Sequence, residues 1–142
     1  MSANRWGVLL LATVGVFACG QASEESNEAR LFLDRYDGLD SPDLADRRRR
    51  IDALLATPLH SEDVTAVRDE CVGMHDLALI AEERSAEALE LTEAVEAGDR
   101  DALERGNAAI QASEVAATAA GEKQERCDRL LASLRTRHSP RR

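Results

Sequence analysis

The sequence predicts an all-α protein built around one long antiparallel helical hairpin, with arms at about 61–97 and 99–138. Apolar or small residues recur in both arms at alternating steps of three and four, which is the spacing of a coiled-coil seam. When the chain is folded beside Gly98, the two seams keep one constant register along their whole length. That register places Cys71 opposite Cys127, so seam spacing and cysteine placement predict the same geometry.

The expected seam is rich in small residues. In the first arm it consists of Val64, Val67, Cys71, Met74, Ala78, Ala81, Ser85, Ala88, Thr92 and Val95. In the second arm it consists of Leu103, Gly106, Ile110, Ser113, Ala117, Ala120, Gln124, Cys127, Leu131 and Leu134. Small side chains let two helices approach closely, but they bury little apolar area.

Two shorter helices are predicted before the hairpin, at about 27–36 and 42–56. Gly38 ends the first, and Pro58 ends the second. Asp40 or Ser41 is the expected N-cap of the second, with a proline at its first helical position. Helices of this length are about 20 Å long and cannot cover an arm of about 50 Å. They are therefore expected to form a small bundle at the base of the hairpin, leaving the half farther from it with two helices only.

Composition and charge restrict the class of protein. Aromatic residues make up 3% of the chain, so no large aromatic-lined ligand cavity is expected. The formal net charge is −9, which argues against nucleic acid as a partner. Between Ser61 and Glu104 there are 14 acidic residues and 3 basic ones, so the projecting part of the hairpin is expected to be strongly acidic.

The N-terminus has the features of an export signal. A short segment with one arginine precedes an apolar run from Trp6 to Ala18, which is too short for a stable membrane-spanning helix. The run ends Val16-Phe17-Ala18-Cys19, which resembles the lipobox of bacterial lipoprotein signal peptides. The resemblance implies a diacylglycerol thioether on Cys19, cleavage before it and acylation of the new amine, for example with palmitate. Ordinary signal-peptidase cleavage after Gly20 is the alternative.

This resemblance implies a domain division and a location. Residues 1–18 are the expected signal peptide, 19–28 a lipidated cysteine and flexible tether, 29–138 the helical domain and 139–142 a basic tail. The mature protein is then anchored to a membrane of the cell envelope and faces the periplasm or the exterior. In a Gram-negative host, Gly20 after the cysteine implies the outer membrane.

With Cys19 assigned to the anchor, Cys71 and Cys127 remain as a pair. In an oxidising compartment they are expected to form a structural disulfide. A catalytic redox pair is disfavoured, because such cysteines usually lie close together in a C-x-x-C motif.

Two further groups of residues have a functional and a structural interpretation. His60 and His138 both fall at the open end of the hairpin, near Glu62 and Asp63, and such a set suits a metal ion or a small cationic ligand. They are also explained as ordinary helix-end residues, and no metal or other cofactor is predicted. The run Arg47, Arg48, Arg49 and Arg50 is either a patch for anionic groups or a set of ion pairs with neighbouring carboxylates.

No set of residues places a nucleophile beside a base, so catalysis is not expected. The predicted function is a structural or protein-interaction role for a lipid-anchored envelope protein, with an envelope protein or a second copy as partner. Leu89 and Leu91 lie off the seam and are the predicted contact residues, since they would be exposed on an otherwise acidic projection. The alternative is an envelope module that binds a metal ion or a small cationic ligand.

Overall fold

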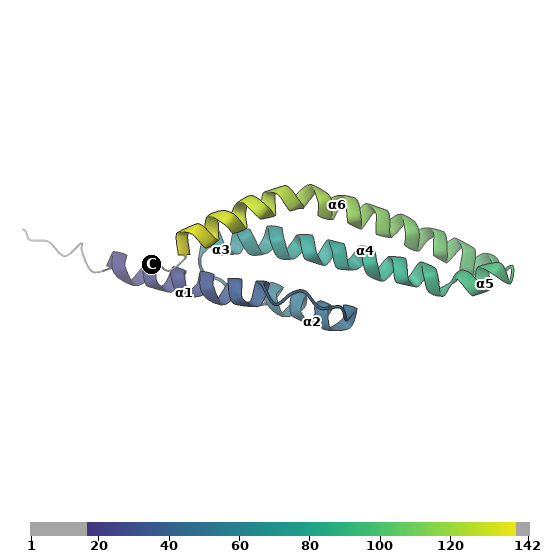
Figure 1. The fold of residues 1–142 in the computed structure, drawn as a ribbon, viewed down its shortest axis with the longest axis horizontal. Helices are drawn as coiled ribbons and strands as arrows, with labels where there is room; N and C mark the ends of the chain where they lie inside the picture. Colours follow the sequence, from purple (N-terminus) through teal and green to yellow (C-terminus); the bar gives the residue numbers. More distant parts are fainter. Residues whose placement is uncertain (1–16, 139–142) are drawn as a thin grey trace, which may run out of the picture.

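The computed structural model describes residues 17–138, and the regular secondary structure of this part of the chain is all helix, without strands (Figure 1). The predicted all-α class is therefore confirmed. The helices are α1 (Phe17–Tyr36), α2 (Leu44–Leu55), α3 (Glu62–Val67), the π-helical turn η1 (Arg68–Val72), α4 (Gly73–Glu90), α5 (Thr92–Glu96) and α6 (Arg100–His138).

Helix α1 begins at Phe17 and includes the segment that was expected to be a flexible tether. That expectation is wrong for 20–28, because the segment contains no proline and continues directly into the helix. Its end nearest the core is also held in place. The carboxylate of Glu28 accepts hydrogen bonds from the backbone N–H groups of His60 and Ser61, at 2.6 and 2.7 Å.

Helix α2 is capped two or three residues later than the sequence suggested. Asp43 is the N-cap, and its side chain accepts a hydrogen bond of 2.8 Å from the backbone N–H of Asp46. Pro42 therefore precedes the cap instead of occupying the first helical position. Ser41 accepts a hydrogen bond from the backbone N–H of Asp43, so it supports the cap without being the cap.

The first long arm begins where it was predicted, but it is not one uninterrupted helix. Ser61 is the N-cap of α3, and its hydroxyl accepts a hydrogen bond from the N–H of Val64. The π-helical turn η1 contains Cys71, and it holds one more residue than an α-helical turn would. A second interruption lies at Leu91, between α4 and α5.

The chain reverses at Gly98, whose φ of 88° is readily adopted only by glycine. The carboxylate of Asp99 then accepts a hydrogen bond of 3.1 Å from the N–H of Ala102, close to the start of α6. Helix α6 returns beside α4 and α3, while α2 lies along α4 and α1 lies beside α3 and α6, both in the part far from Gly98 (Figure 1).

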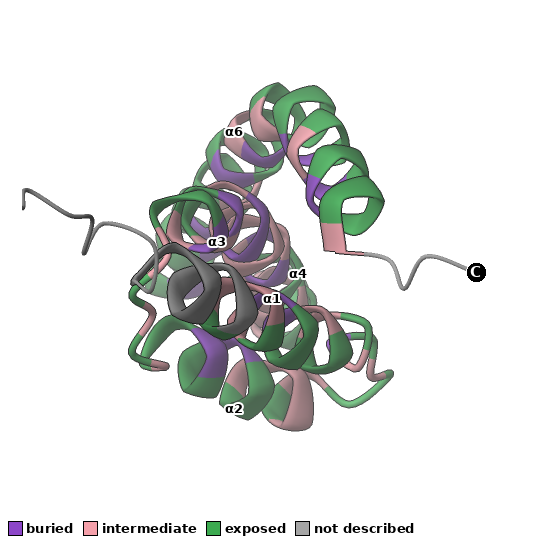
Figure 2. Cartoon of the chain, turned by 90° about the vertical axis from the view of Figure 1, so that its left-hand side faces the viewer, coloured by how far each residue is buried: buried purple, intermediate pink, exposed green. Residues whose placement is uncertain are grey.

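The core lies where these helices meet. Figure 2 shows the buried residues between the helices and the exposed residues on their outer faces. Large side chains that are fully buried come from the loop after α1 and from α2, α3, η1, α4 and α6. They are Leu39, Ile51, Leu54, Val64, Val67, Val72, Leu79 and Leu134. Phe32 adds the only buried aromatic ring of the described residues. We call the remaining part, residues 82–116, the tip segment.

The seam has the predicted spacing, but its phase is wrong in the tip segment. Leu103 and Ile110 were expected in the seam, yet they are 46% and 49% exposed. The buried residues of α6 here are instead alanines and one glycine: Ala102, Gly106, Ala109 and Ala116. Turning its smallest side chains toward the partner lets α6 approach α4 closely, and the larger Leu103 and Ile110 are left at the flank.

Toward the base the predicted phase holds in α6, where Cys127, Leu131 and Leu134 are buried. In the first arm the phase changes at the π-helical turn. Val64, Val67 and Cys71 are buried as predicted, whereas the next buried residues are Val72 and Leu79. A π-helical turn holds one more residue than an α-helical turn, so it rotates the following helix relative to the expected stripe.

Within residues 17–138, no helix combines the length and apolarity needed to cross a membrane. Residues 1–16 of the predicted signal peptide (1–18) and the predicted basic tail at 139–142 lie outside the described residues, and the side chain of Cys19 is likewise not described.

Candidate functional site

A disulfide joins Cys71 in η1 to Cys127 in α6, with their Cα atoms 4.9 Å apart. Both cysteines are fully buried, and both belong to the main core cluster. The bond closes a separation of 56 residues and ties the first long arm to the second at the point where the π-helical turn interrupts the arm. It is therefore placed to fix the register of the two arms.

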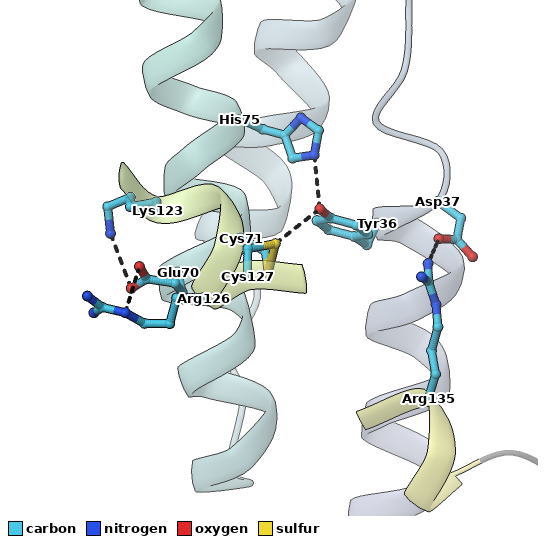
Figure 3. Close-up of a disulfide and its surroundings, with 9 residues drawn as sticks. All are labelled: Tyr36, Asp37, Glu70, Cys71, His75, Lys123, Arg126, Cys127 and Arg135. Carbon is cyan, nitrogen blue, oxygen red and sulfur yellow. Dashed lines mark hydrogen bonds and ion pairs between the residues drawn. A yellow bond between two sulfur atoms is a disulfide. The ribbon is translucent and has the colours of Figure 1, made fainter. Parts of the chain in front are cut away.

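Beside the disulfide lies a polar pair that the sequence did not reveal. The hydroxyl of Tyr36 is 3.0 Å from Nε2 of His75 and 3.7 Å from Sγ of Cys127 (Figure 3). The rings of Tyr36 and His75 meet edge to face, with their centroids 5.3 Å apart. The pair joins the end of α1 to α4 and covers one side of the disulfide.

Burial determines the ionisation of this pair. It raises the pKa of Tyr36 to about 12, so the phenol stays neutral. Burial also lowers the pKa of His75 below its usual value. The negative charge of Asp40 opposes this lowering, and the positive charge of Arg47 adds to it. A neutral imidazole and a neutral phenol suit a structural hydrogen bond. The hydrogen-bonded pair and the buried disulfide thus belong to one packed environment.

Glu70 covers another side of the disulfide. Its carboxylate lies 3.3 Å from Nζ of Lys123 and 3.6 Å from Nε of Arg126, both on α6 (Figure 3). These ion pairs connect the same two elements as the disulfide does.

The arginine run of α2 is engaged in ion pairs. Arg47 pairs with Glu82, and Arg48 pairs with Asp76 and, at 2.9 Å, with Glu83. The hydrogen bond with Glu83 raises the pKa of Arg48, so its guanidinium stays charged. All three carboxylates belong to α4, so this half of the run attaches α2 to α4.

The other half of the run pairs within its own neighbourhood. Arg49 and Arg50 lie 2.9 and 2.8 Å from the carboxylate of Asp46, and Arg50 also donates a hydrogen bond to the carbonyl of Gly38. The hydrogen bond from Arg49 lowers the pKa of Asp46. The ion-pair interpretation of the run therefore accounts for the contacts of all its members.

The structure pairs His60 and His138 with different glutamates. Nδ1 of His60 lies 3.5 Å from Glu28, and Nε2 of His138 lies 3.6 Å from Glu25. Burial opposes ionisation of Glu28, but the backbone hydrogen bonds from His60 and Ser61 outweigh it and lower the pKa of this carboxyl. Among the described residues, no group of three or more His, Cys, Asp or Glu side chains is arranged to hold a metal ion.

An apolar groove lies at the junction of the base and the tip segment. It is shallow and open to solvent, has a volume of about 460 Å³, and is lined by Leu44 of α2, by Ala81, Glu82, Ser85, Ala86 and Leu89 of α4, and by Ser113 and Ala117 of α6. Its floor is held together by two hydrogen bonds of 2.8 Å, one between the hydroxyls of Ser85 and Ser113 and one from Ser113 to the carbonyl of Ala81. We call this the tip groove.

The tip groove carries the most exposed leucine of the described residues. Leu89 is 74% exposed, as the sequence predicted. Leu91 was predicted beside it, but it is half-buried because it lies at the interruption between α4 and α5, where the backbone leaves the helix axis. Of the two predicted contact residues, the structure therefore places only Leu89 in the groove.

Comparisons with protein-family models, with curated proteins and with solved structures find no match to this chain. The assignment of a role therefore depends on the site itself.

Two parts of the site were missed at the sequence level. The polar pair of Tyr36 and His75 joins residues far apart in sequence, and no local pattern marks such a contact. Ile110 and Leu103 were assigned to the seam, although the alanines one residue before each of them were an available signal for the alternative phase. The exposed leucine and the ion pairs of the arginine run were both foreseen.

Proposed function

We propose that this protein is a lipid-anchored interaction protein of the bacterial cell envelope, without catalysis, that binds another envelope protein through its tip segment. Cys19 carries the anchor in this proposal. The long helices form a coiled-coil-like antiparallel hairpin, and α1 and α2 complete a small bundle at its base. The hairpin then holds the tip segment away from the bundle.

The observation that supports an interaction role best is the tip groove. A side chain as large as Leu89, exposed beside an apolar groove, leaves apolar area in water that a partner would cover. Single exposed leucines are common on protein surfaces. Here, however, the leucine borders a groove whose other lining includes Leu44 and three alanines, so it is not an isolated apolar side chain.

The contacts in the base are consistent with a rigid scaffold for this surface. The disulfide, the ion pairs of Glu70 and those of Arg47 and Arg48 all lie in the base or at its boundary with the tip segment. They connect α2, η1, α4 and α6, so they hold the base in one arrangement.

Co-purification after crosslinking in cells tests the interaction. Leu89→Glu is expected to abolish capture of the partner while leaving the helical content and the disulfide unchanged, because the side chain contacts little in the free protein. Leu31→Glu is the matched control, since Leu31 is 50% exposed on α1 and does not line the groove. Capture that is equal in both variants would reject the tip segment as the binding surface.

The anchor requires its own test. Cys19→Ser is expected to leave an unprocessed precursor and to remove metabolic fatty-acid label from the protein. Label that remains on the Cys19→Ser protein would reject the lipobox interpretation, and the protein would then have to reach the envelope by ordinary signal-peptidase processing.

A binding module for a small cationic ligand is the second candidate. It is favoured by an acidic cavity of about 890 Å³ at the base end, lined by Glu24, Glu25, Asn27, Glu28, His60, Ser61, Glu62 and Asp63. Metal analysis of untagged protein, followed by calorimetric titration with a divalent cation and with a polyamine, tests this candidate. Saturable binding that is lost in Glu25→Gln would support it, and absence of binding by either probe would reject it.

A further inference from the structure

The protein already contains one helix bound in the way that the tip groove suggests. Helix α2 packs on α4 with Ile51 and Leu54 buried, and Leu44 reaches the edge of the tip groove. On its flank, Arg47 and Arg48 pair with carboxylates of α4. The face of α4 beside α6 thus accepts a helix with apolar residues at helical spacing and arginines next to them.

Helix α2 covers only part of that face, because it begins at Leu44. Beyond this point the groove continues along α4 to Ala86 and Leu89. On α6, Ile110 and Leu103 lie one and two heptads before Ala117 and therefore in the same stripe of the helix. They are also half-exposed, so apolar side chains continue from the start of α2 toward Gly98.

The charges along this strip continue the pattern seen beneath α2. Asp76, Glu82 and Glu83 are each paired with an arginine of α2. Glu93 and Glu96 follow in α5, beyond the interruption at Leu91, and continue the run of acidic residues along the first arm. Within the described part of the chain, neither of these two carboxylates has an ion-pair partner.

We infer that the tip groove binds a basic amphipathic helix of a partner protein, in line with α2 and by the same combination of contacts. The inference deepens the proposed function and rests on it. The open strip from Ser85 to Glu96 measures about 18 Å, so it accommodates about three turns of helix. The partner helix presents apolar residues at steps of three and four to Leu89 and Ile110, and lysine or arginine to Glu93 and Glu96.

Charge selects this occupant over a second copy of the chain. The protein has a net charge of −9, and the tip segment holds 10 acidic residues against 3 basic ones, so two tip segments repel each other. A basic helix instead gains attraction from the same charges. An anionic membrane surface is disfavoured for the same reason.

A labelled peptide tests the inference directly. The probe is a fluorescent 14-residue peptide with the sequence of residues 43–56 in which the three aspartates are replaced by lysine. The matched control peptide carries glutamate at every basic position. Fluorescence anisotropy is measured with the purified full-length chain in phosphatidylcholine nanodiscs, and empty nanodiscs serve as the blank.

We expect saturable binding of the basic peptide with one site per chain, and weaker binding as salt is raised. Leu89→Glu and Ile110→Glu should each lower the affinity by about tenfold or more, because a charge replaces a buried apolar contact. Leu31→Glu should leave it unchanged. Circular dichroism of each variant verifies that the helices remain folded.

Several results would overturn the inference. These are equal binding of the acidic control peptide, absence of binding by the basic peptide, or binding that Leu89→Glu and Ile110→Glu do not alter. A concentration-dependent dimer that Leu89→Glu abolishes would assign the groove to a second copy instead. The proposed function fails separately, through the crosslinking experiment, because that readout depends on Leu89 whatever the charge of the partner. Capture that requires Leu89, together with a basic peptide that does not bind, would reject only the basic helix.

Discussion

The disulfide between Cys71 and Cys127 is expected to provide a large part of the stability of this fold. Its loop of 56 residues corresponds to about 4 kcal/mol on the chain-entropy model of cross-links. For a helical domain of this size, such a loss of stability lowers the melting temperature by roughly 15 °C. The seam cannot replace the contribution, since in the tip segment it consists of alanine, serine and glycine.

Thermal unfolding followed by circular dichroism measures this effect. The wild-type protein is compared with and without a phosphine reductant, beside the double variant Cys71→Ala/Cys127→Ala. Reduction should lower the melting temperature of the wild type to near that of the double variant, and it should not change the double variant. Tyr36→Phe is a useful control, because it removes the hydroxyl next to the disulfide, leaves the bond in place and should cost only about 1 kcal/mol. A shift of less than about 3 °C on reduction, or two titratable thiols in the oxidised protein, would refute this reasoning.

Three further predictions follow from the packing. The pKa of His75 is lowered in the folded protein, so the unfolded chain binds a proton more readily and stability falls as the pH drops below 6.5. When the pH is lowered from about 7.5 to about 5.5, the melting temperature should therefore fall less for His75→Gln than for the wild type. Equal pH dependence of the two proteins would contradict this. Gly98→Ala should destabilise the protein by about 1 kcal/mol, because Gly98 has a positive φ. Gly106→Ala should not destabilise it, because an added Cβ there meets no atom within 4 Å. Equal effects of the two substitutions in chemical denaturation would contradict the assigned turn. Amide hydrogen exchange should be faster in the tip segment than in the base, because the tip segment has fewer buried large side chains, and uniform protection along α4 and α6 would contradict the division.

The sequence was sufficient to predict the features that depend on local periodicity and on residues that start, end or reverse a helix. Alternating steps of three and four identified the long arms, and Gly98 marked the reversal because a tight connection there needs a positive φ. The start of the first arm at about 61 was predicted, and Ser61 is the N-cap there. The pairing of Cys71 with Cys127 followed from the register.

The features that the sequence did not predict depend on choices between similar alternatives. In the tip segment two stripes of α6 fit the heptad spacing, one with Leu103 and Ile110 and one with Ala102 and Ala109. Close approach of the helices favours the alanines, and spacing alone cannot distinguish the two. The π-helical turn at Cys71 likewise has no sequence signature, because its extra residue is accommodated by tertiary contacts.

In the candidate site, too, some features could be predicted from the sequence and others could not. The exposure of Leu89 was predictable, since it lies off the predicted seam of the first arm. The groove beside it was not, because it depends on where α2 ends and on which side of α6 faces α4. Ile110 entered the candidate surface only once the phase of the seam was known.

Photo-crosslinking from the tip groove in living cells tests the central proposal most directly. A benzoylphenylalanine residue is placed at Leu89 in one strain and at Leu31 in another, and the adducts are compared after irradiation. We predict one major adduct with a second protein from position 89, through a basic amphipathic helix of that protein, and none of that mass from position 31. Identical adduct patterns from the two positions, or no adduct from position 89, would contradict the proposal that the tip groove is the functional surface.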